Sequence, residues 1–226
     1  MNSSDSFPAG QPAARQAAYG EHARSYDRDT GAFQPYRQAV VEALPLRQGQ
    51  VVLDVGCGTG RCCGLLRDKV GLRGSVVGIE ESPQMVAVAR ERIACEGWRN
   101  VTFVQSCAEE AQLARTADAA LFCAVHDIMQ SPGALRNVMN RLRPGAWVAA
   151  GGGKWAEPMM MGVNFLVGML HAPYVRSFSG FDRPWRHLER LLEDVRVREI
   201  AFGSGYIMTG QVPARPHIHH QHGNTA

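Results

Sequence analysis

The chain has 226 residues, of which 45% are hydrophobic and 20% are charged, the size and composition of one globular domain. Its net charge of +3 is mild and its arginines are scattered, so we expect no nucleic-acid partner. The first residues lack a basic segment followed by an apolar one. We therefore expect no secretory leader and a cytoplasmic protein.

The six cysteines include no Cys-x-x-Cys pair, which predicts buried free thiols in a reducing compartment and no metal site. Four histidines near the end of the chain fit an unstructured polar tail better than a metal site. The stretch 158–175 contains no Asp, Glu, Lys or Arg. Proline and glycine interrupt it and it is shorter than the ~20 residues of a spanning helix, so we expect no integral membrane segment.

Residues 1–14 are rich in Ser, Pro, Ala and Gly, and we expect them to be disordered. A single domain is predicted over 15–212, followed by a His-rich disordered tail over 213–226. Within the domain, 15–45 predicts two short helices broken near 29–31, and 152–185 predicts an insert. Both are expected to form a lid.

Strand and helix patterns alternate after these helices, as in a parallel sheet covered on both faces. The expected strands are Val51–Val55, Ser75–Glu80, Val101–Gln105, Ala119–Val125 and Ala146–Gly151, then a hairpin of Val195–Phe202 and Tyr206–Gln211. The expected helices are Arg61–Val70, two that begin after Ser82 and Ser131, an apolar one within 155–175, and Trp185–Glu193. Leu142 is expected on the inner face of the helix after Ser131, which Arg143–Gly145 should end.

The most informative stretch is Val51–Gly60, an apolar strand with one acid that runs into glycines at 56, 58 and 60. Glycines between a strand and a helix let a ligand approach the backbone closely, because no Cβ stands in the way. A dinucleotide fingerprint counted from Gly56 would need its third glycine at position 61, where this chain has Arg61. The second strand ends in Glu80, where folds of this kind hydrogen-bond the hydroxyls of a ribose.

Asp54 with this tight glycine triplet resembles motif I of the class I S-adenosylmethionine-dependent methyltransferases. The resemblance extends over about 26–211 and is strongest to small-molecule enzymes related to the ubiquinone/menaquinone C-methyltransferases. Arg47–Gly60, Gln84-Met85 after Ser82, and Leu142–Gly145 carry it. It implies an α/β, Rossmann-like sheet of seven mostly parallel strands, with helices on both faces and a C-terminal antiparallel hairpin.

The resemblance also implies S-adenosyl-L-methionine as cofactor. It implies cofactor contacts from Asp54, Gly56, Cys57, Gly58, Gly60, Glu80, Glu81, Met85, Cys107, Ala108 and Ala124. Asp54 would meet the methionine ammonium, Glu80 the ribose and Met85 the adenine face, although Asp54 can also brace the loop and Met85 can be a core residue. Cys107 stands where the family usually has an acid for the adenine amino group, which leaves Glu109 or a backbone carbonyl as substitutes.

The acceptor is expected to be a small organic molecule bound by residues that overhang the carboxyl edge of the sheet. The expected contacts are Tyr26, Tyr36, His126, Trp155, Asn164 and Tyr174. His126 is also the one candidate catalytic residue, as a general base, because imidazole titrates near neutral pH. A structural hydrogen bond is the competing interpretation of this histidine. The protein is expected to be a monomer or a homodimer.

Three other functions remain open. The same cofactor supports aminocarboxypropyl transfer or cyclisation, which release methylthioadenosine rather than S-adenosylhomocysteine. A non-catalytic cofactor-binding protein is the second. A lipid acceptor at a membrane surface is the third, and liposome binding that is lost on replacing Phe165 and Leu166 with Asp would support it.

Overall fold

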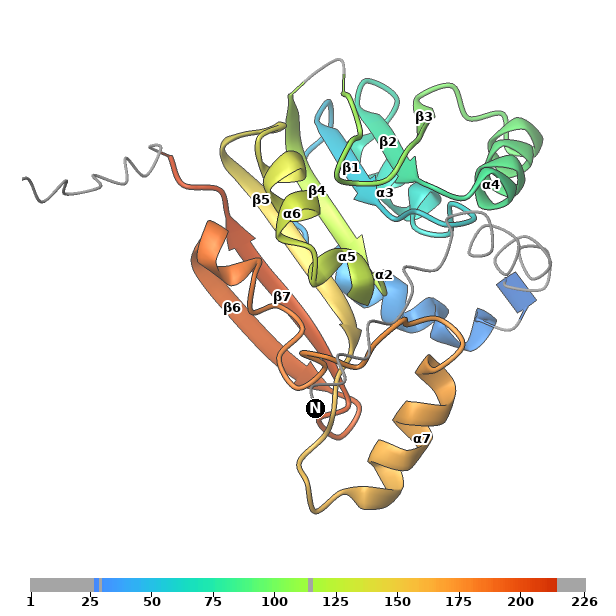
Figure 1. Ribbon diagram of the computed structural model, residues 1–226. Helices are drawn as coiled ribbons and strands as arrows, with labels where there is room; N and C mark the ends of the chain where they lie inside the picture. The colour runs from blue at the N-terminus through green and yellow to red at the C-terminus, as the bar shows by residue number, and fades with distance from the viewer. Residues whose placement is uncertain (1–26, 29, 114–115, 215–226) are drawn as a thin grey trace, which may run out of the picture.

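A computed structural model describes residues 27–28, 30–113 and 116–214, which form one seven-stranded sheet with helices on both faces (Figure 1). The strands are β1 Val51–Val55, β2 Ser75–Glu80, β3 Val101–Gln105, β4 Ala117–Cys123, β5 Leu142–Gly153, β6 Glu193–Ile200 and β7 Gly205–Gln211. Their order in the sheet is β3-β2-β1-β4-β5-β7-β6. β1 to β5 run parallel, and β7 runs antiparallel to both β5 and β6. The predicted Rossmann-like fold class is confirmed.

The helices divide between the two faces of the sheet. They are η1 Gly31–Phe33, α2 Gln34–Glu42, α3 Cys63–Val70, α4 Pro83–Cys95, α5 His126–Met129, α6 Pro132–Met139, α7 Met161–His171 and η2 Glu189–Leu191. α2 and α3 bury apolar side chains on one face, and α6 with the segment 185–192 buries them on the other. Because both faces are covered, the central strands are apolar on both sides, and β1 and β4 are buried along almost their whole length.

The two predicted helix starts are confirmed in atomic detail. The Ser82 hydroxyl accepts a hydrogen bond from the Met85 amide at 3.3 Å, and the Ser131 hydroxyl accepts one from the Ala134 amide at 3.2 Å. Each of these serines is followed by a proline at the first helical position. A backbone N–H at that position would have no partner within the helix, so proline costs no hydrogen bond there. These caps fix where α4 and α6 leave the carboxyl edge of the sheet.

Several element boundaries differ from the prediction, among them the end of β4, the end of α6 and the start of β5. β4 ends at Cys123, so residues 124–125 form a loop. α6 ends at Met139, and Leu142 begins β5 instead of facing the sheet from a helix. This happens because Leu142 pairs with Ala117 across a bulge, which draws 142–145 into the strand.

The predicted helix over Trp185–Glu193 is wrong, since only the short η2 forms there. Trp185 and Leu188 are buried, and the Trp185 ring packs 4.8 Å from that of Tyr206 on β7. The chain must enter β6 at Glu193, which pairs with Gln211. Packing at one end and strand pairing at the other leave room for one turn only.

The first fourteen residues and 215–226 lie outside the described residues, as do most of 15–30. Within the described parts of the chain, no helix combines the length and apolar character that crossing a membrane requires.

Candidate functional site

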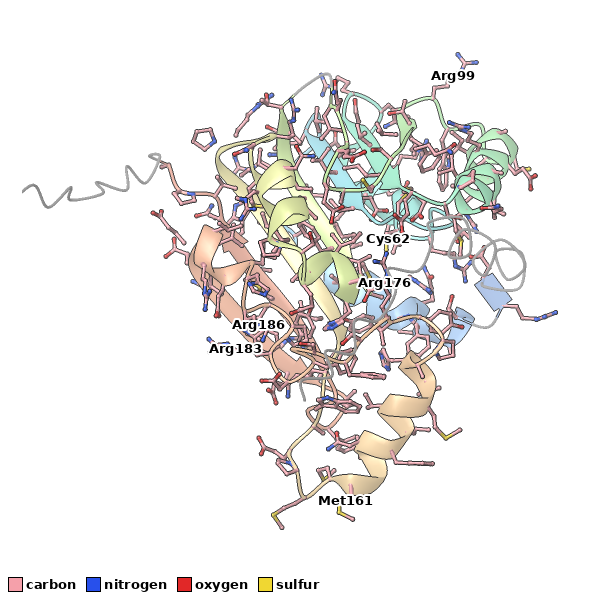
Figure 2. The ribbon with its side chains drawn as sticks, viewed as in Figure 1. Cys62, Arg99, Met161, Arg176, Arg183 and Arg186 are labelled. Carbon is pink, nitrogen blue, oxygen red and sulfur yellow. The ribbon has the colours of Figure 1, made fainter. Side chains whose placement is uncertain are left out.

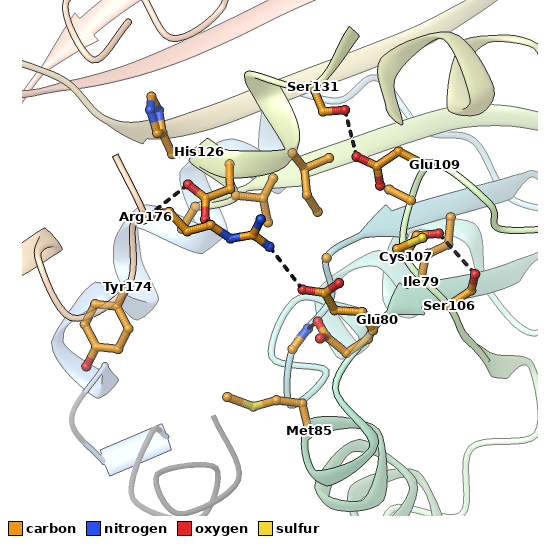
Figure 3. A pocket seen from close by; sticks show the side chains of 18 residues that line it. Ile79, Glu80, Met85, Ser106, Cys107, Glu109, His126, Ser131, Tyr174 and Arg176 are labelled. Carbon is orange, nitrogen blue, oxygen red and sulfur yellow. Dashed lines mark hydrogen bonds and ion pairs between the residues drawn. The ribbon is translucent and has the colours of Figure 1, made fainter. Parts of the chain in front are cut away.

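A cavity of about 230 Å³ opens at the carboxyl edge of the sheet, where the loops after β1, β2, β3 and β4 meet (Figure 3). It is lined by Gly56, Gly58, Ile79, Glu80, Glu81, Met85, Ser106, Cys107, Ala108, Glu109, Ala124, Val125, His126, Asp127, Ile128, Ser131, Tyr174 and Arg176. Ligands of open α/β sheets bind at this edge. The sheet order brings these loops together although their residues lie far apart in the sequence.

The glycine loop forms the floor of the cavity. Gly56 has φ +67°, and a Cβ there would lie 2.6 Å from Val125 Cγ1, so only glycine fits against the neighbouring loop. Gly58 has φ +54°, and a Cβ on it would meet nothing within 4 Å. The bare backbone of Gly58 therefore faces open space, as expected of a loop that a ligand approaches closely.

Glu80 braces that loop. One carboxylate oxygen accepts a hydrogen bond from the Gly58 amide and the other from the Ser82 amide, both at 2.9 Å. Burial raises the pKa of Glu80, and the backbone amides oppose this shift. A carboxylate has about four lone-pair sites, so the amides do not occupy all of them and Glu80 can still accept a hydrogen bond from a ligand in the cavity.

A second cavity of about 50 Å³ lies on the other side of the loop and shares Gly56, Gly58 and Ala124 with the first. Asp54, fully buried in the core, lines it and accepts a hydrogen bond from the Cys63 thiol at 3.4 Å. Burial raises the pKa of Asp54 to about 7, and the nearby Glu80 adds to the rise. Arg37 and Arg61 also line this cavity, so its lining contains one acid and two cationic side chains.

His126 begins α5 on the wall opposite Met85. Its Nε2 lies 3.1 Å from the carbonyl oxygen of Ser179, and a carbonyl only accepts, so the hydrogen is assigned to Nε2. The other nitrogen, Nδ1, is buried and has no hydrogen-bond partner within the described residues. Burial lowers the pKa of His126, which keeps the ring neutral and leaves a lone pair on Nδ1.

The segment 172–181, which follows α7, crosses the mouth of the cavity and contributes Tyr174 and Arg176. The Arg176 guanidinium lies 3.3 Å from an oxygen of Asp127 and 3.6 Å from one of Glu81, and its backbone amide donates to Asp127 at 3.2 Å. Figure 3 shows the Arg176 side chain between α5 and the loop after β2. The segment is therefore tied to α5 by several contacts and to the loop after β2 by one ion pair.

The structure brings most of the predicted site residues to the two cavities. Of the cofactor set, ten of the eleven line one or both, and Gly60 lies in the turn below them. Cys107 lines the main cavity without a carboxylate, and the nearby Glu109 instead accepts a hydrogen bond from the Ser131 hydroxyl at 2.7 Å. Ala124 adopts φ +58°, a strained conformation for a non-glycine residue, where β4 gives way to the loop.

Three predicted acceptor contacts lie elsewhere, and a fourth, Tyr26, is outside the described residues. The Tyr36 hydroxyl donates to the carbonyl oxygen of Tyr206 at 3.0 Å, on the α2 face of the sheet. Trp155 packs against Phe178 with ring centroids 5.0 Å apart. Asn164 hydrogen-bonds both backbone groups of Ala156, which pins the start of the insert to α7.

Sequence reasoning missed Arg176 and Ser179. Both lie about fifty residues after the β4 loop that they contact, in a segment without regular structure. Only the fold places them at the mouth of the cavity. The absence of Asp, Glu, Lys and Arg from 158–175 gives no signal for the arginine that follows.

Known proteins resemble this chain in sequence and in fold. Residues 46–151 match a family model described as a methyltransferase domain. The chain is 34% identical over 93 residues to aklanonic acid methyltransferase DauC of Streptomyces sp. (strain C5), covering 41% of this chain and 42% of that one. It is 29% identical over 134 residues to the ubiquinone/menaquinone biosynthesis C-methyltransferase UbiE of Legionella pneumophila (strain Corby), covering 54% and 52%. The matches thus span about half or less of these curated relatives.

Solved structures share the fold at low sequence identity. One is phosphoethanolamine N-methyltransferase 2 of Haemonchus contortus in complex with S-adenosyl-L-methionine, with a TM-score of 0.70 and 14% identity over 92% of this chain and 61% of that chain. Another is a SAM-dependent methyltransferase from Aquifex aeolicus, with a TM-score of 0.55 and 20% identity over 78% of this chain and 89% of that one.

Proposed function

Because the chain belongs to the class I S-adenosylmethionine-dependent methyltransferases, we propose that it transfers a methyl group from this cofactor to a small organic acceptor. The observation that carries the proposal is the glycine loop braced by Glu80 at the carboxyl edge of the sheet. The family and its cofactor follow from the comparisons. The acceptor class is inferred from the partly apolar cavity and from relatives whose names give aklanonic acid and ubiquinone/menaquinone biosynthesis.

The two cavities fit the cofactor in shape and charge. In the proposed arrangement, Glu80 accepts hydrogen bonds from the ribose hydroxyls with lone pairs that the backbone amides leave free. The open space over Gly58 admits the methionine chain of the cofactor, since no Cβ intrudes. Asp54 in the smaller cavity would face the ammonium of the methionine end, and Arg37 and Arg61 would face its carboxylate. Met85 would pack on the adenine.

The protein has two tasks in this reaction, and neither requires strong acid–base groups. S-adenosylmethionine, when bound, supplies a methyl group already activated by a sulfonium. The walls of the cavity hold the acceptor in line and exclude water, which is the main source of rate acceleration. Ser179 fixes a hydrogen on Nε2 of His126 and burial keeps the ring neutral, so Nδ1 is the nitrogen that would accept a proton. Because Nδ1 is buried, the ring must turn toward the cavity before it can act as a base.

The alternatives predict different products. Aminocarboxypropyl transfer or cyclisation would release methylthioadenosine, and a non-catalytic protein would bind the cofactor without turnover. The intact loop, Asp54 and Glu80 support catalysis on the cofactor, but they do not distinguish which carbon–sulfur bond breaks.

The first experiment is calorimetric titration of the full chain with S-adenosylmethionine, followed by mass spectrometry after incubation with a panel of quinone, phenol and polyketide acceptors. We expect binding and formation of S-adenosylhomocysteine with at least one acceptor. Methylthioadenosine would favour the alternative chemistry. Absence of binding would overturn the proposed function.

A further inference from the structure

The outer face of α7 is an exposed apolar surface. Met161, Phe165, Leu166 and Met169 are exposed by 75, 70, 55 and 62%, and Leu170 lies beside them. Figure 1 shows α7 standing away from the sheet beyond its carboxyl edge, and Figure 2 shows the Met161 side chain pointing out from its end. We call the exposed side chains of Met159, Met160, Met161, Phe165, Leu166, Met169, Leu170 and Tyr174 the α7 patch.

The inner face of the same helix is packed. Val167 is buried, and the His171 ring lies 5.3 Å from that of Phe181. Gly153 has no room for a side chain because His171 occupies that space. The helix is thus held rigidly on one side while the α7 patch is open on the other, so the exposure does not come from an unattached segment.

The patch is large enough for a protein interface. Eight large apolar side chains at these exposures leave an area on the order of several hundred Å². Monomeric proteins seldom expose more than about 600 Å² in one apolar patch, and one partner of a stable dimer contributes about 800 Å². Four of the eight side chains are methionines, which adapt their shape to a neighbouring surface.

The sequence around α7 favours a second copy of this chain over an anionic lipid surface. No Lys or Arg occurs from 155 to 175, and the guanidinium of Arg176, just after the helix, is already paired with Asp127 and Glu81. A twofold axis across the helix pairs two copies antiparallel, which opposes the two helix dipoles. A helix that binds anionic lipid instead carries Lys and Arg on its flanking face.

We propose that the α7 patch is the interface of a twofold-symmetric homodimer in which two α7 helices pack antiparallel. The patch ends at Tyr174, which also lines the cavity. The partner helix would therefore cover the outer side of the cavity mouth next to segment 172–181. Dimerisation is independent of the reaction, so the two proposals can fail separately.

Sedimentation velocity of the full chain over a wide range of concentrations tests the interface. We expect a reversible dimer. Phe165→Asp and Met169→Asp, tested separately, should each raise the dimer dissociation constant by about a hundredfold, because the twofold axis repeats every substitution. Both side chains are mostly exposed, so circular dichroism melting should show a folded monomer.

Leu72→Asp is the matched control, since Leu72 is 81% exposed in the loop before β2, at the opposite edge of the sheet. It should leave the dissociation constant unchanged. A wild-type chain that stays monomeric at every concentration would overturn the proposal. A monomer that co-sediments with phosphatidylcholine vesicles, and loses this with Phe165→Asp, would overturn it in favour of a lipid surface.

Discussion

Replacing Glu80 with alanine tests the site most directly, because this one carboxylate braces the glycine loop and is proposed to bind the ribose. The change removes the acceptor of two backbone amides, those of Gly58 and Ser82. A hydrogen bond to a charged group contributes about 1.5–3 kcal/mol, but water in the open cavity can replace part of this. We therefore expect the free energy of unfolding to fall by about 2 kcal/mol, or the Tm by about 4–8 °C.

Cofactor affinity should fall by more than stability does. Two ribose hydroxyls that lose a carboxylate acceptor forfeit about 3 kcal/mol, which is roughly a hundredfold in the dissociation constant. Titration calorimetry with S-adenosylhomocysteine measures this without a known acceptor. Calorimetric melting of the same samples measures the change in the free energy of unfolding.

Two variants separate the roles of Glu80. Glu80→Gln keeps one oxygen to accept an amide, so it should recover part of the stability and little of the affinity. Glu91→Ala, on the exposed side of α4, should change neither quantity. Unchanged affinity of Glu80→Ala for S-adenosylhomocysteine would refute the assignment of this residue to the ribose.

Three more predictions follow from the site. Gly56→Ala should lower the Tm and abolish cofactor binding, because the new Cβ would lie 2.6 Å from Val125 Cγ1; a variant that binds normally in calorimetry would contradict this. Asp54, with its pKa raised to about 7, stays protonated in the folded, ligand-free chain where the unfolded chain is ionised, so stability should fall as pH rises from about 4 to 7 and level off above. Affinity for S-adenosylmethionine should rise over the upper part of that range, as Asp54 ionises to meet the ammonium, and Asp54→Asn should remove this pH dependence. Arg176→Gln should speed the release of S-adenosylhomocysteine about two- to fivefold in stopped-flow fluorescence by breaking the ion pair to Glu81, whereas equal release rates would show that segment 172–181 does not retain the ligand.

Local sequence signals predicted the first half of the fold well. Ser75–Glu80 is the second strand to the residue, and Ser82 and Ser131 cap helices through their own hydroxyls. Such signals act between residues that are close in the chain, so they do not depend on the tertiary packing. The prediction failed at Trp185–Glu193, where burial of Trp185 and the pairing of β6 override the helical pattern.

The cofactor side of the candidate site could be predicted from the sequence, whereas most of the acceptor side could not. The cofactor side rests on short-range features, namely the glycine loop and the acid at the end of the next strand, and the structure gathers nearly all of it around two cavities. The acceptor side depends on segments far apart in the chain. Asn164 and Tyr36 have the right chemistry for an acceptor contact, yet their polar groups are used on the backbone of Ala156 and Tyr206.

A glycine loop and a strand-end acid act through backbone geometry that their own neighbours set, so the sequence alone was enough to predict the fold class, the resemblance to the methyltransferases and the cofactor. The tertiary structure was needed to show that Arg176 lies at the cavity mouth, that Ser179 hydrogen-bonds His126 and that one face of α7 is left open. These three features depend on where a long insert folds back onto the sheet. That path is fixed by the sum of many weak packing contacts, and no short stretch of sequence encodes it.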